Sequence, residues 1–129
     1  MKNPVTEICD LNSELPPDAP DAPQWLVDAL QVPREEGWVT SEGCDVHYFR
    51  WGDPANPPLL LMHGFLAHAR CMAFIAPFLA EQYHVVAYAL SGMGDSGVRS
   101  SYPDAIRAQE VVDVARETDL FDHAMKPIV

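Results

Sequence analysis

The chain has 129 residues, 48% of them hydrophobic, so it is long enough for one folded domain and too short for two. Its 19 acidic and 8 basic residues give a net charge of −11, which argues against nucleic acid or an anionic membrane as a partner. Its 3 cysteines form no CxxC pair, which argues against a zinc site or a disulfide framework, and no stretch approaches the roughly 18 apolar residues of a membrane span.

Residues 1–36 are predicted to form an acidic, proline-rich N-terminal arm that contains one short helix. Residues 1–23 carry 5 acids, 1 lysine and 5 prolines, and proline lacks an N–H donor and restricts φ, so we expect an extended or disordered segment. Gln24 to Gln31 gathers its apolar residues on one helical side, and Pro33 would end that helix. The start of the chain lacks the apolar run of about 7–15 residues typical of a signal peptide, so we expect a cytoplasmic protein.

Residues 37–129 are predicted to form the folded domain, and this domain opens with two strands. Trp38 to Ser41 and Cys44 to Trp51 read as β-strands, joined at Glu42-Gly43, which is a tight-turn signal. Residues 52–57 then form a loop rich in proline, glycine, asparagine and aspartate.

The middle of the chain predicts a strand–helix–strand unit. Leu59 to Met62 is short and continuously apolar, as in a strand buried on both faces, and His84 to Leu90 repeats this pattern. Between them, apolar residues recur at helical spacing, with Pro77 expected to kink or shorten the helix and Cys71 expected in the core. Two strands joined through a helix predict a parallel pair, and hence an α/β fold.

The last third of the chain predicts one further helix and the beginning of a strand. Asp104 is placed to cap the helix. Lys126 to Val129 reads as a strand that has only begun. The residues expected to face inward from the helix are Ala105, Ala108, Val111, Val112 and Ala115.

A glycine-rich segment, Gly92 to Gly97, matches two motifs only superficially. The GxGxxG spacing would suggest a nucleotide-binding oxidoreductase, but Pro103 would fall inside the helix that such a site requires. Neither Ser91 nor Ser96 has both glycines of a GxSxG nucleophile elbow, so we expect both hydroxyls to bond the local backbone. The hypothesis of a nucleotide-binding oxidoreductase is therefore less favoured than the two functional hypotheses given below.

Leu59 to Phe65 and Ala89 to Gly97 together resemble the α/β-hydrolase superfamily, over about residues 38–129. The resemblance implies the N-terminal part of an α/β-hydrolase sheet, with the first strands antiparallel, then a parallel βαβ unit, and the sheet incomplete. It also implies a hydrolase that acts by nucleophile–histidine–acid catalysis on a small ester, epoxide or similar molecule. No cofactor and no metal are implied.

The resemblance also assigns candidate site residues. The backbone N–H of Phe65 would form half of an oxyanion hole, Gly64 would let the backbone approach the substrate, and His63 would support the loop through hydrogen bonds. Leu66 stands where many epoxide hydrolases and dehalogenases have proline, which favours an esterase-like or C–C bond hydrolase. Ala89 replaces an aspartate common in the family, so loop N–H groups are expected to lack a side-chain acceptor.

The same resemblance places the nucleophile, acid and base after Val129, so the chain itself is expected to be an inactive fragment of an enzyme. The other histidines, His47, His68, His84 and His123, are expected to be packing or surface residues. The second hypothesis is a non-catalytic, truncated or partner-dependent protein, because the family's third strand would keep one bare edge. The sequence leaves the substrate, the nucleophile's identity and the oligomeric state open.

Overall fold

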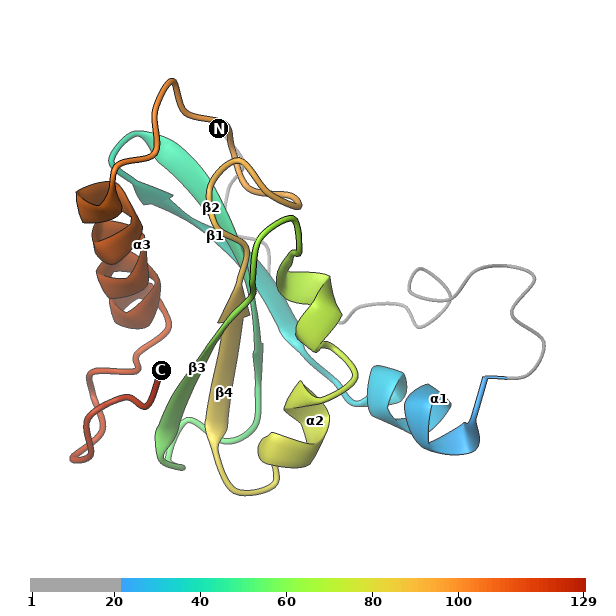
Figure 1. The fold of residues 1–129 in the computed structure, drawn as a ribbon. Coiled ribbons are helices and arrows are strands. Elements are labelled where there is room, and N and C mark those ends of the chain that lie inside the picture. The colour runs from blue at the N-terminus through green and yellow to red at the C-terminus, as the bar shows by residue number, and fades with distance from the viewer. Residues whose placement is uncertain (1–21) are drawn as a thin grey trace.

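The computed structural model describes residues 22–129, so the extended arm expected before them lies outside the described residues. Eight elements follow in chain order (Figure 1): α1 Gln24–Gln31, β1 Glu35–Ser41, β2 Cys44–Trp51, β3 Pro58–Met62, the 3-10 helix η2 Ala69–Met72, α2 Ala76–Leu79, β4 His84–Tyr88 and α3 Asp104–Glu117. The predicted short helix and both predicted hairpin strands are confirmed, although β1 begins earlier than the expected Trp38. None of the helices in this range is long and apolar enough to cross a membrane.

The strands form one mixed sheet in the order β1-β2-β4-β3. β1 pairs antiparallel with β2, β2 antiparallel with β4, and β3 parallel with β4. Glu42 and Gly43 both have positive φ, 46° and 76°, which is the geometry of the tight hairpin turn predicted between β1 and β2. The predicted fold class, antiparallel first strands followed by a parallel βαβ unit, is confirmed.

Two apolar cores lie on opposite faces of the sheet. In Figure 1, α3 stands on one side, while η2, α2 and α1 stand on the other. Side chains of β2 and β4 alternate between the faces, as the period of a strand requires. One core contains Phe49, Trp51, Val85, Ala87, Ala89, Leu30, Ala69, Ala73 and Ala76. The other contains Val46, Tyr48, Leu60, Val86, Tyr88, Val114, Ala115 and Leu120.

β4 is buried along its whole length, but β3 is not. Within the described residues β3 has β4 on one side only, and Met62 is half-exposed. Its other side receives a single parallel bridge, in which Ile128 N–H donates to Pro58 O at 3.1 Å and Leu60 N–H donates to Ile128 O at 2.8 Å. The strand expected at the end of the chain is thus present as this one bridge.

The connection between β3 and β4 is not one continuous helix. It divides into η2 and α2, with Pro77 in the first turn of α2, where its missing N–H costs nothing. In this connection the small residues Ala69, Ala73 and Ala76 lie in the core, while Phe74, Ile75 and Phe78 are half-exposed. The expectation that Cys71 packs in the core is wrong, because its side chain is exposed.

α3 contacts the sheet mainly through its C-terminal half. Val114 and Ala115 are buried, whereas Ala105 and Ala108, which were expected to face inward, are exposed. Asp104 is the first helical residue and makes no capping bond, so its predicted capping role is wrong. The N-terminal half of the helix faces the glycine-rich loop instead, through Arg107 and the buried Glu110.

Candidate functional site

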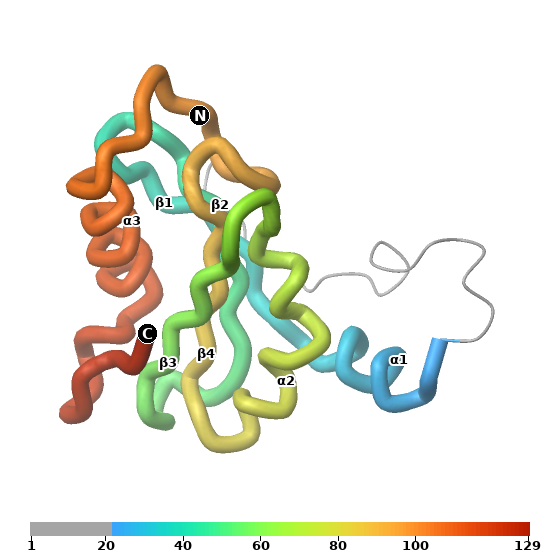
Figure 2. Tube along the Cα trace, viewed as in Figure 1, coloured from blue at the N-terminus to red at the C-terminus, as the bar shows by residue number. Residues whose placement is uncertain are grey.

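A cavity of about 570 Å³ lies at the carboxyl ends of β3 and β4. Because the two strands are parallel, the segments that leave them come together at the same end of the sheet, as Figure 2 shows. Tyr102 and Arg107 complete the wall. The lining from the two strand ends comprises His63, Gly64, Phe65 and Leu66 after β3, and Leu90, Ser91, Gly92 and Met93 after β4. The three candidate site residues that the resemblance assigned, His63, Gly64 and Phe65, therefore all line this cavity.

His63 joins the two loops. Its Nε2 accepts a hydrogen bond from the Leu90 N–H at 2.9 Å, and its Nδ1 lies 2.7 Å from the Gly64 carbonyl oxygen. In this arrangement Nε2 accepts and Nδ1 faces the carbonyl as a donor, so both ring nitrogens are engaged. Through these two contacts His63 connects the loop after β3 to the loop after β4.

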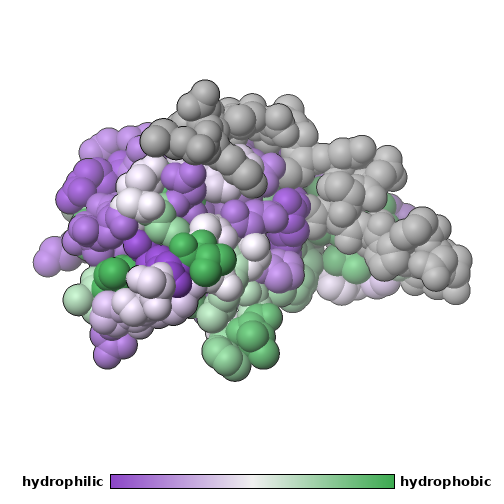
Figure 3. Space-filling view, turned by 90° about the horizontal axis from the view of Figure 1, so that it is seen from above, coloured by the Kyte–Doolittle hydropathy of each residue, from purple (hydrophilic) through white to green (hydrophobic). Residues whose placement is uncertain are grey.

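Phe65 and Leu66 stand at the mouth of the cavity. Their side chains are 85% and 79% exposed, and a turn closes beneath them through the Ala67 N–H and the Gly64 carbonyl at 3.2 Å. Within residues 22–129 the Phe65 N–H donates to no acceptor. Figure 3 looks onto this end of the sheet, where apolar side chains project among polar ones.

The glycine-rich loop after β4 is folded tightly upon itself. The Gly92 N–H donates to the Gly97 carbonyl at 2.7 Å, and the Gly97 N–H donates to the Asp45 carbonyl at 2.7 Å. Ser96 Oγ donates to the Ala89 carbonyl at 2.6 Å, a backbone bond within this segment as expected. It also accepts from the His47 N–H of β2 at 2.8 Å, which is not local. Residues 98–103 are not helical, so these glycines do not open a helix as they would in a dinucleotide site.

Glu110 supplies the carboxylate that Ala89 was expected to leave missing. It is fully buried, and its Oε2 lies 3.3 Å from the Ser91 N–H while its Oε1 accepts from the Ser91 hydroxyl. Arg99 Nε and the Arg107 guanidinium contact the same carboxylate at 3.1 and 3.3 Å. The expectation of loop N–H groups without a side-chain acceptor is therefore wrong for Ser91, and Ser91 bonds a side chain rather than only local backbone.

Sequence reasoning missed Glu110, although one signal could have found it. Ile106, Glu110 and Val114 recur every four residues, so an acid stands on the helix face that also carries the buried Val114. An acid at such a position needs a partner in the interior. The two arginines that provide it, Arg99 and Arg107, come from a loop and from the same helix.

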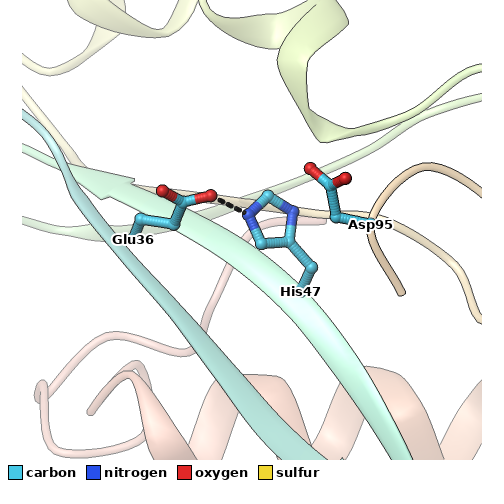
Figure 4. A group of neighbouring side chains, drawn as sticks. All are labelled: Glu36, His47 and Asp95. Atoms are coloured by element: carbon cyan, nitrogen blue, oxygen red, sulfur yellow. Dashed lines mark hydrogen bonds and ion pairs between the residues drawn. The ribbon is translucent and has the colours of Figure 1, made fainter. Parts of the chain in front are cut away.

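A second polar cluster, Glu36, His47 and Asp95, has ligand atoms within 4.8 Å of one another (Figure 4). His47 Nε2 lies 2.6 Å from Glu36 Oε1, and burial lowers the pKa of this imidazole even though Glu36 favours its charged form. Arg70 approaches Asp95 at 3.0 Å and Glu36 at 3.5 Å. Since the guanidinium already supplies positive charge to both carboxylates, this arrangement is that of an ion-pair cluster and disfavours an added cation.

Sequence comparison finds relatives for part of the chain, while no protein-family model matches it. The chain is similar to an uncharacterized hydrolase of Saccharomyces cerevisiae, YNR064C, at 34% identity over 61 residues, which cover 47% of this chain and 21% of that protein. It is 29% identical over 86 residues to the probable oxidoreductase EphD of Mycobacterium bovis, covering 67% of this chain and 14% of that protein. The chain thus spans about a fifth and about a seventh of the lengths of these two relatives.

Solved structures with the same fold are α/β-hydrolases of several kinds. A bacterial membrane phospholipase A, described as a virulence factor, matches with a TM-score of 0.59 and 36% identity, covering 64% of this chain and 27% of that one. The thioesterase domain from the curacin biosynthetic pathway matches with a TM-score of 0.60 and 30% identity, covering 65% and 31%. Epoxide hydrolase A from Mycobacterium thermoresistibile shares the fold at 22% identity with a TM-score of 0.61, covering 67% and 28%.

By its sheet order, its two loop motifs and these likenesses, the chain has the fold of the α/β-hydrolase superfamily, as a partial domain.

Proposed function

We propose that this chain is part of a hydrolase that acts by nucleophile–histidine–acid catalysis on a small ester, epoxide or similar molecule. Its own contribution is one side of the oxyanion hole, with the Phe65 N–H as donor, Gly64 as the point of close approach and His63 as support. The observation that carries this proposal is the Phe65 N–H, which has no acceptor within residues 22–129 and lies at a cavity of about 570 Å³ where the carboxyl ends of two parallel strands meet.

The chemistry explains why such a donor matters. Acyl transfer places negative charge on the substrate's carbonyl oxygen, and a preset N–H at that point is worth about 3 kcal/mol in the transition state. The hydrogen bond from Leu90 to His63 ties the donor's loop to β4, so the donor does not have to reorganise as charge develops.

The 129-residue chain by itself is proposed to be inactive. Ser91 and Ser96 are both buried, and both hydroxyls are engaged with protein acceptors, Glu110 for Ser91 and the Ala89 carbonyl for Ser96. The sequence contains no GxSxG segment that would present a nucleophile on an elbow. Turnover of p-nitrophenyl esters or of an epoxide by the purified chain, lost on substitution of either serine, would overturn this part of the proposal.

The donor role is tested by Phe65→Pro, which removes the N–H, against Phe65→Ala, which keeps it. In the longest gene product that contains this sequence, Phe65→Pro is expected to lower kcat about 10²- to 10³-fold relative to Phe65→Ala. Equal kcat values for the two folded variants would refute the assignment of Phe65.

A second candidate function, a protein that depends on a partner chain, is favoured by the outer side of β3. Among the described residues only the bridge at Ile128 pairs with it, and an open strand edge can add a strand from another chain. Analytical ultracentrifugation of the purified chain tests this. A monomer that unfolds cooperatively would argue against a partner being needed.

A further inference from the structure

The cavity at the ends of β3 and β4 combines an apolar wall with one charged group. Phe65, Leu66, Leu90 and Met93 supply apolar surface, and among the described residues of the lining Arg107 is the one that is permanently charged. Its volume of about 570 Å³ falls within the roughly 300–1,000 Å³ of small-molecule sites, which are mostly apolar with a few placed polar groups. The ligand chemistry is therefore decided largely by what Arg107 can bind.

The position of Arg107 is fixed by bonds from one nitrogen. Its Nη1 donates to the Ser91 carbonyl at 2.9 Å, to Ser91 Oγ at 3.1 Å and to Glu110 Oε2 at 3.3 Å. The guanidinium carbon also lies 4.7 Å from the centre of the Tyr102 ring, a cation–π arrangement. The guanidinium is thus held in place before any ligand arrives.

The remaining donors of Arg107 are open. Within residues 22–129 its Nε and Nη2 make no hydrogen bond, and its side chain is 25% exposed. Arg99 provides the contrast, because its Nε, Nη1 and Nη2 all donate to protein acceptors, at Glu110, Glu42 and Ser41. Of the two arginines on Glu110, Arg107 alone lines the cavity and retains donors for a ligand.

The charge at this point is also unbalanced. The single carboxylate of Glu110 pairs with two guanidinium groups, so the cluster retains one positive charge. This local excess is opposite in sign to the net charge of −11 of the chain. A carboxylate fits it, because guanidinium donors match the two carboxylate oxygens and bonds between charged partners are stronger than neutral ones.

We propose that this cavity selects ligands that join an apolar chain to a carboxylate, with the carboxylate on Arg107 and the chain against Phe65, Leu66, Leu90 and Met93. This deepens the proposed function and rests on it, since it names the substrate class of that hydrolase as apolar esters that carry a free carboxylate. No catalytic step is needed for the recognition itself, so binding can be measured apart from turnover.

The experiment compares decanoate, methyl decanoate and decylammonium as ligands of the purified chain, by calorimetry below the micelle concentrations of the two ions and below the solubility limit of the ester. General attraction to a protein of net charge −11 would favour the ammonium ligand and disfavour the carboxylate. The proposal predicts the reverse, with decanoate bound about tenfold more tightly than methyl decanoate. Absence of binding by decanoate, or equal binding of decanoate and its ester, would overturn it.

Variants on α3 locate the preference. Arg107→Gln is expected to remove the roughly tenfold preference while leaving the affinity for methyl decanoate within about twofold. The matched control is Arg116→Gln on the same helix, whose side chain is 69% exposed and pairs with Asp113, and it should behave as wild type. A preference that survives in folded Arg107→Gln would refute the role of Arg107.

Circular dichroism establishes whether Arg107→Gln folds. If it does not, Arg107→Lys takes its place, because lysine keeps the charge but cannot bind a carboxylate through two parallel bonds. The preference for decanoate should then fall below the wild-type value, and an unchanged preference would count against the proposal. Hydrolase assays of the longest gene product that contains this sequence report separately on the proposed function. A carboxylate preference in the purified chain without turnover in that longer product would leave the proposed function, and not the binding, in question.

Discussion

The Nε2 atom of His63 accepts a hydrogen bond from the Leu90 N–H at 2.9 Å and so ties the end of β3 to the end of β4. Both strands open into the cavity, and this bond crosses between their loops. A bond of this kind restrains the loop that carries Phe65. Its contribution can be measured in the isolated chain.

His63→Ala removes the acceptor and leaves the Leu90 N–H without its partner. We expect the free energy of unfolding to fall by about 1–3 kcal/mol, the cost of leaving such a group unpaired. Amide exchange at Leu90 should accelerate more than exchange within β2. The control is His123→Ala, which should change stability little, because among the described residues its ring accepts only from the nearby Met125 N–H. An unchanged exchange rate of the Leu90 amide in His63→Ala would contradict a restraining role of the hydrogen bond between Leu90 and His63.

Glu110 holds the glycine-rich loop to α3, so Glu110→Ala should be strongly destabilising. It would leave Arg99 and Arg107 without their shared carboxylate, and breaking a buried ion pair from one side costs about 3–5 kcal/mol. Urea denaturation measures the difference. Glu117→Ala, an exposed acid on the same helix, serves as the control and is expected to stay within about 0.5 kcal/mol of wild type. Equal losses of unfolding free energy in Glu110→Ala and Glu117→Ala would show that the buried carboxylate stabilises the fold no more than an exposed one does.

Two glycines that line the cavity are predicted to differ sharply in tolerance. Gly92 has φ of 82°, and a Cβ there would lie 2.5 Å from the Tyr102 hydroxyl oxygen, whereas a Cβ on Gly64 would meet nothing within 4 Å. Gly92→Ala should therefore lose about 1–3 kcal/mol of stability through backbone strain and the clash. Gly64→Ala is its matched partner and should stay within about 0.5 kcal/mol of wild type. Thermal unfolding of both variants decides the point, and a similar Tm for the two would be the contrary result.

Acid should destabilise the fold through its buried histidines. Burial is the first cause that lowers the pKa of His84, and the nearby Arg50 is the second, while Asp119, Glu35 and Asp53 act in the opposite direction. The unfolded chain then takes up the proton first, near pH 6.5, so this stability is present above about pH 6.5 and is lost as the pH falls toward the folded pKa.

His84→Leu is therefore expected to flatten the fall in unfolding free energy between about pH 6.5 and 5, measured by urea denaturation. Part of the slope should remain, because burial also lowers the pKa of His47. A slope in His84→Leu as steep as in wild type would contradict the assignment to His84.

Much of the fold follows from short stretches of sequence. The turn at Glu42-Gly43 and the apolar run before His63 predicted strands that the structure contains. The residues that face the sheet between β3 and β4 could not be predicted in the same way. Pro77 lies in the first turn of a separate short helix, α2, so one continuous helical spacing does not apply there. The buried faces of η2, α2 and α3 depend on where the neighbouring elements pack, which helical spacing alone does not specify.

The same division holds at the candidate site. The sequence by itself determined that His63, Gly64 and Phe65 follow an apolar strand and that a glycine-rich loop follows the next one, because such signals act between residues close along the chain. Only the tertiary structure decided that Glu110 takes over the role expected of an acid at Ala89, and that Arg107 lines the cavity with open donors. Ser91 and Glu110 lie 19 positions apart, and they meet because α3 packs back against the sheet beside the loop. Burial of a charge and the choice of its partners are set by such distant packing, which no local pattern of residues contains.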